Sequence, residues 1–369
     1  MIVGIPKEVK NNEYRVSLTP SGVDMLVKEG HRVLVEEKAG VGSGFGDEDY
    51  RAAGAVITDR DGVFGEADLV VKVKEPIPDE YDFLRERQLL FTYLHLAANE
   101  HLTRTLMKKK VTAIAYETVE TLNGFLPLLA PMSEVAGRMA VQVAAHYLEK
   151  ENGGAGKLLG GVPGVAPCSV VILGAGVVGT NAAQMALGMG ARVTLIERNV
   201  ERLRYLSTIL HGNLTTLAAV AQNTADAVRS ADVVIGAALV AGAKAPRLVT
   251  REMIRTMKPG GVIVDISVDQ GGCIETTHPT THSNPTYEVD GVVHYGVSNM
   301  PGAVPHTSTY ALTNVTLPYI LKLSALGFQA AIREDGELAK GVNVCGGHLT
   351  SVPVANSFGL PYVPLTEVA

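Results

Sequence analysis

Residues 169–197 read SVVILGAGVVGTNAAQMALGMGARVTLIE, a strand of buried type that runs directly into a glycine-rich turn and then into a helical pattern. Gly174 permits a tight turn, Gly176 lets the backbone approach a pyrophosphate without a side chain, and Gly179 lets the helix pack closely on the strand. The free N–H groups and the positive end of that helix attract an anion. This order of strand, GxGxxG turn and helix predicts a dinucleotide-binding unit.

An acidic residue, Glu197, closes the next strand, RVTLIE. A carboxylate there can accept both ribose hydroxyls of the adenosine half and would repel the additional phosphate of NADP. Arg198 and Arg202 follow, and either could pair with a 2′-phosphate, although an ordinary solvated helix start with Arg202 near the adenosine also accounts for them. The pattern favours NAD as the cofactor and leaves residual use of NADP open.

Alternating strands and helices extend this pattern to the rest of the chain. The strand-like runs are, in order, IVGIP, HRVLVEE, AVITD, DLVVKVK, QLLFTYLH and VTAIAYE before the glycine turn, and ARVTLIE, ADVVIGAAL, GGVIVDIS and VVHYGVS after it. A helical pattern at residues 131–151 is long enough to cross between two domains. After Pro305 the pattern is helical and without strands, so we expect this end of the chain to pack on the first domain.

These observations predict an α/β protein of two Rossmann-like domains with doubly wound parallel sheets, the first domain being discontinuous. Residues 1–128 and 305–369 form the predicted substrate and catalytic domain. Residues 129–304 form the predicted NAD-binding domain. The length of 369 residues agrees with this division, because a single hydrophobic core rarely grows to that size.

Composition excludes several classes of function. The net charge of -6 and the scattered Lys and Arg residues leave no basic face for nucleic acid. No run of about 18 apolar residues could span a membrane, and the N-terminus lacks the pattern of a secretion signal, so we expect a cytoplasmic protein with no membrane partner. Cys168, Cys273 and Cys345 are far apart and odd in number, which predicts neither a disulfide framework nor a metal site.

Several longer motifs accompany the glycine turn. They are MIVGIPKEVKNNEYRVSLTP, LVVKVKEP, LLFTYLHLA, APMSEVAGRMA, GGVPGV, VDISVDQGG and YGVSNMPGAVPHTST. In this order they resemble the alanine dehydrogenase family, which is related to the NAD-binding component of proton-translocating transhydrogenase. The resemblance covers essentially the whole chain and implies a homohexameric enzyme that interconverts L-alanine with pyruvate and ammonia through an imine, using NAD.

A keto acid has a carboxylate, for which the protein needs an Arg or Lys clamp. Arg15 follows a short polar loop, and Lys74 ends the apolar run DLVVKVK immediately before Glu75-Pro76. Lys72 lies two residues earlier on the same side of that run and is the competitor. The resemblance assigns the substrate carboxylate to Arg15 and Lys74.

Proton exchange needs a group that titrates near neutral pH, and His95 ends the apolar run QLLFTYLH. Asp269 follows the run GGVIVDI in the second domain, where a carboxylate would stabilise a cationic iminium. Asp265 is the alternative, but it lies within the strand and is expected to be held by backbone hydrogen bonds. By resemblance, His95 and Asp269 are the catalytic residues.

The remaining predicted contacts come from the starts of helices and the ends of strands. Ser133 can offer a hydroxyl to the cofactor, with an ordinary helix-start serine as the equal alternative. The other predicted contacts are Met132 and Asn299 for the substrate, and Val177, Val178, Ala238, Leu239, Ile266, Val297 and Met300 for the cofactor, with Arg202 and Asp269 also beside it.

Two alternative functions stay open at this point. One is an NAD(H)-binding module like the transhydrogenase component, which needs no amino-acid site. The other is a dehydrogenase for a different small 2-amino acid. Lys74 in KVKEP and His95 in YLHLA argue against the first, and the sequence does not determine the side-chain pocket that would settle the second.

Overall fold

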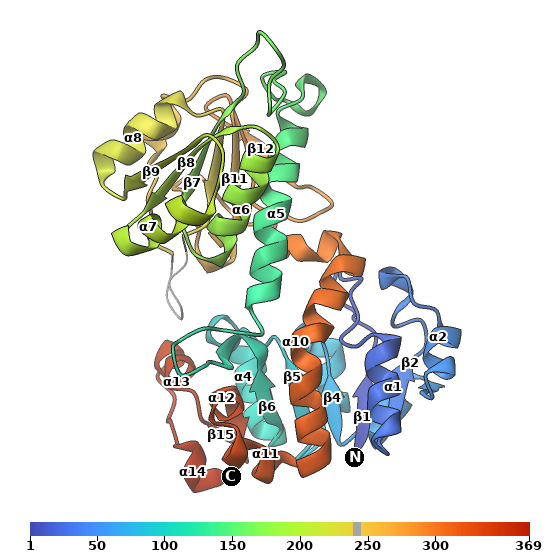
Figure 1. Cartoon of the computed structure of the whole chain (residues 1–369). Coiled ribbons are helices and arrows are strands. Elements are labelled where there is room, and N and C mark those ends of the chain that lie inside the picture. The colour runs from blue at the N-terminus through green and yellow to red at the C-terminus, as the bar shows by residue number, and fades with distance from the viewer. Residues whose placement is uncertain (239–244) are drawn as a thin grey trace. The chain divides into compact units, whose positions relative to one another are not determined.

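The computed structural model describes residues 1–238 and 245–369, which form two compact units (Figure 1). The first unit comprises Met1–Met132 and Gly302–Ala369, and the second comprises Ser133–Pro301. The first unit is therefore discontinuous in sequence. The chain passes from one unit to the other at residues 132–133 and 301–302, where the sequence predicted 128–129 and 304–305.

An eight-stranded sheet runs through the first unit in the order β15-β14-β6-β5-β4-β1-β2-β3. Its strands are β1 (Ile2–Ile5), β2 (Arg32–Glu36), β3 (Val56–Thr58), β4 (Leu69–Val71), β5 (Leu89–Thr92), β6 (Thr112–Ala115), β14 (Val342–Cys345) and β15 (His348–Leu349). The pairs from β6 to β3 are parallel, and only β14 pairs antiparallel, with β6 and with β15.

A seven-stranded sheet forms the second unit in the order β12-β13-β11-β10-β7-β8-β9. Its strands are β7 (Ser169–Leu173), β8 (Arg192–Glu197), β9 (Leu214–Ala218), β10 (Val233–Gly236), β11 (Val262–Asp265), β12 (Thr286–Val289) and β13 (Val292–Tyr295). Among the described strands of this sheet, the edge strand β12 pairs antiparallel with β13 and the other pairs are parallel. The predicted α/β class with two doubly wound, mainly parallel sheets is confirmed.

Helices alternate with the strands in both units, and those between parallel strands form the crossovers that such pairs require. In the first unit and its return they are α1 (Pro20–Lys28), α2 (Asp47–Ala52), α3 (Arg60–Glu66), α4 (Glu100–Lys109), α10 (Pro305–Leu326), α11 (Phe328–Glu334), α12 (Gly336–Lys340), α13 (Val352–Phe358) and α14 (Leu365–Val368). The others are α5 (Ala130–Tyr147), α6 (Val177–Gly188), α7 (Val200–Ile209), α8 (Ala221–Ser230) and α9 (Arg251–Ile254).

Short 3-10 helices follow several strands and carry some of the candidate site residues. They are η1 (Val41–Ser43), η2 (Pro78–Phe83), η3 (Leu96–Ala98), η4 (Tyr116–Thr118), η5 (Lys150–Asn152), η6 (Ile266–Gln270) and η7 (Met300–Ala303).

The C-terminal segment does pack on the first unit, but the expectation that it has no strands is wrong. β14 joins the first sheet beside β6, and Val344 lies in the same buried cluster as Leu90, Leu94 and Ala113. The run VNVC of β14 is too short for its alternation to stand out, and the neighbouring strand supplies the partner that makes it a strand.

Disulfides and membrane-spanning helices are two features that residues 1–238 and 245–369 do not show. All three cysteines are buried and free of disulfides. Within the same described part of the chain, none of the helices is long and apolar enough to cross a membrane.

Candidate active site

The glycine turn connects β7 to α6 with little space around two of its residues. Gly174 has a φ of 100°, a left-handed conformation that favours glycine, and a Cβ there would lie 2.7 Å from the Ala237 carbonyl oxygen. A Cβ on Gly179 would lie 1.8 Å from the Gly174 carbonyl oxygen. Gly174 therefore makes the turn, and Gly179 allows the helix to approach it.

Gly176 differs from both neighbours in the motif. Its φ is −69°, and a Cβ built there meets no described heavy atom within 4 Å. Gly176 is the N-cap of α6 and has no side chain that could accept hydrogen bonds from the N–H groups of the first helical turn. Val177 and Val178 lie in that turn and are half-buried. The turn thus presents open space and backbone donors at the positive end of a helix.

Glu197 lies beside this turn at the end of β8. Its carboxylate accepts hydrogen bonds from the backbone N–H of Ala175 (2.8 Å) and of Asn199 (2.9 Å). Two oxygens with one bond each keep acceptor capacity for ribose hydroxyls. Glu197 is therefore oriented by the same loop that carries the three glycines.

The two arginines after Glu197 have different surroundings. The Arg202 guanidinium donates to the Ala175 carbonyl (3.0 Å) and to the Thr180 hydroxyl (3.0 Å), so it braces the glycine turn. Arg198 is exposed. Of the two, Arg198 is the better placed to reach a 2′-phosphate, because Arg202 would first have to leave the turn.

The strand ends beyond β7 carry most of the other predicted cofactor residues. Ala238 follows β10, and its carbonyl accepts a hydrogen bond from the Ser267 hydroxyl (2.6 Å). Asp269 is exposed on η6, directly after β11, and Ile266 begins that helix half-buried. Leu239 lies outside the described residues.

Asp265, the alternative to Asp269, is fully buried. Its carboxylate accepts hydrogen bonds from the backbone N–H groups of Ser267, Cys273 and Ile274 (3.0, 3.0 and 3.3 Å) and from the Thr277 hydroxyl (2.6 Å). This carboxylate ties η6 to the following loop, and its inaccessibility leaves Asp269 as the carboxylate that can meet a ligand.

The last predicted residues of the second unit lie near its C-terminal end. Val297 and Met300 are buried, and Asn299 between them has a φ of 77°. The His282 imidazole Nε2 lies 3.0 Å from the Asn299 carbonyl oxygen. Ser133 is half-buried in the first turn of α5.

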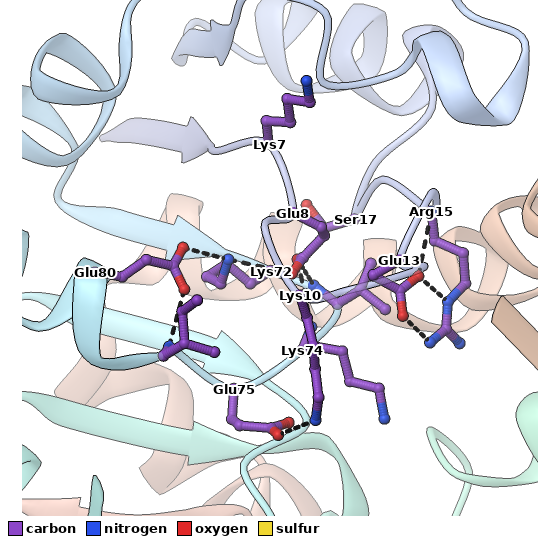
Figure 2. A network of polar contacts seen from close by, with 12 residues as sticks. Lys7, Glu8, Lys10, Glu13, Arg15, Ser17, Lys72, Lys74, Glu75 and Glu80 are labelled. Carbon is purple, nitrogen blue, oxygen red and sulfur yellow. Dashed lines mark hydrogen bonds and ion pairs between the residues drawn. The ribbon is translucent and has the colours of Figure 1, made fainter. Parts of the chain in front are cut away.

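In the first unit, Arg15 lies in the loop between β1 and α1 and is nearly inaccessible, with 2% of its side chain exposed (Figure 2). The guanidinium forms a bidentate pair with Glu13, with Nε 2.6 Å from one carboxylate oxygen and Nη2 2.6 Å from the other. Nη1 lies 3.0 Å from the Met132 sulfur. Burial disfavours the charged guanidinium, but the bonds to Glu13 outweigh it and raise the pKa of Arg15.

Lys72 and Lys74 have opposite environments. The Lys72 ammonium is fully buried between Glu80 (2.7 Å) and Glu8 (3.2 Å). In Figure 2 dashed lines join Lys72 to both carboxylates and Lys10 to Glu75, whereas none reaches the ammonium of Lys74. Burial, and after it the charge of Arg15, lower the pKa of Lys74. The charge of Lys72 is thus used in the interior of the unit, whereas the Lys74 ammonium makes no ion pair with a described carboxylate.

Both lysines lie past the strand rather than in it, because β4 ends at Val71. Glu8 holds this segment, since one of its oxygens accepts hydrogen bonds from the backbone N–H of Val73 (2.6 Å) and Lys74 (3.3 Å). A carboxylate from the loop after β1 therefore fixes the backbone that carries Lys74.

His95 also lies beyond its strand, three residues after β5 ends at Thr92, and adopts a φ of 48° that is uncommon for a residue other than glycine. Glu117 stabilises this conformation by accepting the backbone N–H groups of Leu94 (3.2 Å) and His95 (2.6 Å). The imidazole stacks on Tyr93 at 6.0 Å between ring centroids, and 45% of the side chain is exposed. The ring is held and accessible.

The sequence did not identify Glu13, Glu117 and Tyr93, which orient the predicted residues. Glu13 could have been found only as the acidic neighbour of Arg15 in NNEYR, a weak signal. Glu117 meets His95 through the pairing of β5 with β6, which no local pattern reveals. Among the described residues, no group of three His, Cys, Asp or Glu side chains is arranged to hold a metal ion.

Comparison with known proteins matches two family models to the chain. "Alanine dehydrogenase/PNT, N-terminal domain" matches residues 4–136 and "Alanine dehydrogenase/PNT, C-terminal domain" matches residues 140–352. Alanine dehydrogenase of Bacillus subtilis is 57% identical over 99% of this chain and 96% of its own length. That of Methanococcus maripaludis is 54% identical over 99% and 98%.

Solved structures give the same result. An L-alanine dehydrogenase superposes with a TM-score of 0.94 at 54% identity, covering 97% of this chain and 99% of its own. A transhydrogenase from Sinorhizobium meliloti superposes with a TM-score of 0.82 at 26% identity, covering 95% and 99%.

Proposed function

This chain belongs to the alanine dehydrogenase/PNT family, and we propose that it is an L-alanine dehydrogenase, which catalyses the reversible NAD-dependent oxidative deamination of L-alanine to pyruvate and ammonia. The identity to alanine dehydrogenases extends over nearly the full length of both proteins, whereas the transhydrogenase relative is half as similar.

The observation that carries this proposal is the pair of cations Arg15 and Lys74. Arg15 is buried with its partner Glu13, and Lys74 makes no ion pair with any described carboxylate. Lys74 is half-buried, and a positive charge that is partly withdrawn from water without a protein partner is costly unless a ligand supplies the negative charge. A small keto or amino acid does so through its carboxylate, which a module that binds only NAD would not need.

The glycine turn of the second unit suits a dinucleotide. The open space at Gly176 accommodates a pyrophosphate close to the backbone, α6 contributes its N-terminal N–H groups, and Glu197 is oriented to accept ribose hydroxyls. When bound, the nicotinamide ring of NAD accepts the hydride from the α-carbon of alanine and returns it in the reverse direction. We assign the contacts along the rest of the cofactor to Ala238, Ile266, Val297 and Met300, and one hydroxyl to Ser133.

For the chemistry on the substrate we assign three roles. Arg15 and Lys74 hold the carboxylate of pyruvate, with Met132 and Asn299 beside it, and Lys74 polarises the carbonyl oxygen. Ammonia adds to the carbonyl carbon, and His95 exchanges the protons that are needed for the carbinolamine to lose water. Asp269 stabilises the resulting iminium through its negative charge.

The proposal also includes the localisation and the oligomeric state of the enzyme. We propose a cytoplasmic enzyme and a homohexamer, the second by resemblance to the family. Light scattering coupled to gel filtration measures the assembly directly, and a mass other than six chains would reject the hexamer.

The test of the proposed function is NADH formation with NAD and a panel of L-amino acids, with NADP in parallel. We expect L-alanine to give the highest kcat/KM and NADP to react poorly. Binding of NADH without oxidation of any amino acid would favour the transhydrogenase-like module. A better substrate than alanine would favour a dehydrogenase of different specificity.

A further inference from the structure

We propose that Glu13 is a positioning residue that also determines specificity: it fixes the Arg15 guanidinium and cancels its charge, so that the substrate subsite favours a ligand with one carboxylate over a ligand with two. This inference rests on the proposed function, because it assumes that Arg15 and Lys74 bind the substrate.

The geometry of the pair supports the positioning role. The two hydrogen bonds of 2.6 Å from Nε and Nη2 to the two oxygens of Glu13 form a bidentate pair, which sets the plane of the guanidinium as well as its place. A third bond, from the Arg15 backbone N–H to the same carboxylate (3.2 Å), closes the loop on itself. Both side chains are at least 98% buried. Arg15 therefore has no freedom to seek a different orientation when a ligand arrives.

The charges around the pair support the specificity role. Lys10 is paired with Glu75 at 2.5 Å, Lys72 is paired with Glu8 and Glu80, and Arg15 is paired with Glu13. Lys7 also makes no ion pair but is exposed to water. Among the described residues of this network, Lys74 is therefore the cation that is partly withdrawn from water without an ion-pair partner for its ammonium (Figure 2).

One substrate carboxylate is enough to balance Lys74. A second carboxylate would find Arg15 already balanced by Glu13 and Lys10 already balanced by Glu75, so its own charge would stay unpaired after losing water. Leaving a charge of the wrong ligand unpaired is a recognised route to specificity.

The experiment compares two ligands that differ in one charge. Malonate has two carboxylates, and malonamate has nearly the same shape with one carboxylate replaced by an amide. Dissociation constants of both are measured by calorimetry on the enzyme saturated with NADH, for the wild-type protein, for Glu13→Gln and for Glu13→Asp. Calorimetry does not depend on turnover, so a chain that fails to oxidise alanine would sink the proposed function without deciding this inference.

We expect the wild-type protein to bind malonamate about tenfold or more tightly than malonate. Glu13→Gln should weaken malonamate binding and at the same time shrink or reverse that preference, because the Arg15 charge is released. Glu13→Asp keeps the charge but shortens the side chain, so it should keep the preference while losing affinity. The dissociation constant of NADH should stay unchanged in both variants.

The matched control is Glu66→Gln. Glu66 also pairs with an arginine of the first unit, Arg32, at 2.6 Å, and both side chains are about half exposed. This variant should keep the wild-type preference. A Glu13→Gln variant with the same preference as wild type and Glu66→Gln would overturn the proposal. Equal affinity of the wild-type protein for malonate and malonamate would overturn it without any variant, even if Glu13→Gln fails to fold.

Discussion

The two units of this chain share one sheet plan but connect their first strand and first helix differently. Numbered from the first strand of each unit, both sheets place the parallel strands in the order 3-2-1-4-5-6, as β3-β2-β1-β4-β5-β6 and as β9-β8-β7-β10-β11-β13. This is the order of a Rossmann sheet, in which ligands bind at the carboxyl ends of the strands.

The two units also share one hydrogen bond, made by the carboxylate at the end of the second strand of each. Glu36 ends β2 and accepts the N–H of Lys7, two residues after β1, at 2.8 Å. Glu197 ends β8 and accepts the N–H of Ala175, two residues after β7, also at 2.8 Å. The carboxylate at the end of the second strand thus braces the first loop in both units.

The loops themselves differ. After β7 three residues, Gly174 to Gly176, lead straight into α6, so the helix terminus faces the sheet edge. After β1 the chain runs from Pro6 to Thr19 before α1 begins, and this longer loop carries Glu8, Glu13 and Arg15. A short glycine loop offers backbone donors for a pyrophosphate, and a long charged loop offers side chains for a small carboxylate. We therefore attribute the different ligands proposed for the two units to their loops and not to their sheets.

The largest effect should come from His95, in the unit to which we assign the substrate. Its replacement by Ala removes the proposed proton carrier, and general acid–base help is typically worth about 10²–10⁴-fold, so kcat should fall by about that factor. NADH affinity, measured by fluorescence titration, should not change because the glycine loop is intact. His101→Ala is the control, since this histidine of the same unit is exposed on α4. A loss of only two- or threefold would remove His95 from the role.

Asp269 offers the corresponding test in the second unit. Asp269→Asn keeps the size and deletes the charge that would stabilise the iminium, so we expect kcat to fall by about 10²-fold with little change in KM for pyruvate. Steady-state kinetics in the direction of pyruvate amination separates the two parameters. Turnover at the parent rate would show that no charge is needed there.

A matched pair of glycine variants tests whether the short loop after β7 binds the pyrophosphate. A Cβ on Gly176 meets no described atom, so Gly176→Ala should keep the Tm of the parent, yet the methyl group would occupy space needed by the pyrophosphate. We expect about tenfold or weaker NADH binding. Gly188→Ala, at the other end of α6 and also without close neighbours, should bind NADH normally. Normal NADH binding by Gly176→Ala would contradict the use of this loop.

The pH dependence of pyruvate binding tests Lys74 in the long loop's network. Burial and then the Arg15 charge lower the pKa of Lys74, while Glu75 opposes them, so the ammonium loses its proton at a lower pH than an ordinary lysine. KM for pyruvate should therefore begin to rise at a pH below 10.5, the ordinary pKa of a lysine. Above the Lys74 pKa it should rise by about tenfold per pH unit. Lys74→Arg stays charged and should remove this rise, whatever its KM. A rise of equal size in both proteins would assign it to another group.

The smallest effect concerns the choice between NAD and NADP. Glu197→Ser removes the carboxylate that would repel a 2′-phosphate, and Arg198 is exposed nearby, so the ratio of NAD to NADP affinity should shrink by a few-fold. Because Glu197 also braces Ala175, NAD binding itself should weaken. An unchanged ratio would leave Glu197 with a purely structural role.

The sequence predicted those parts of the molecule whose chemistry is local. The glycine turn requires glycine at three positions within six residues, and all three are visible in the sequence motif. The alternation did not separate Lys72 from Lys74, and the prediction of Lys74 came from its place before Glu75-Pro76 and from the family resemblance. No local pattern could show that Glu8 and Glu80, from other segments, hold the Lys72 ammonium in the interior. β9 and β12 were missed for a related reason, since half-buried edge strands such as LTTLA have weak patterns of their own.

We propose that a hydride passes from the α-carbon of L-alanine to NAD, and deuterium placed at that carbon measures this transfer directly. Incubation of the protein with NAD and 2-deuterio-L-alanine should give NADH that is one mass unit heavier, together with unlabelled pyruvate, and a slower rate than with ordinary alanine if hydride transfer limits turnover. Pyruvate formed together with unlabelled NADH, or no NADH at all, would contradict the account.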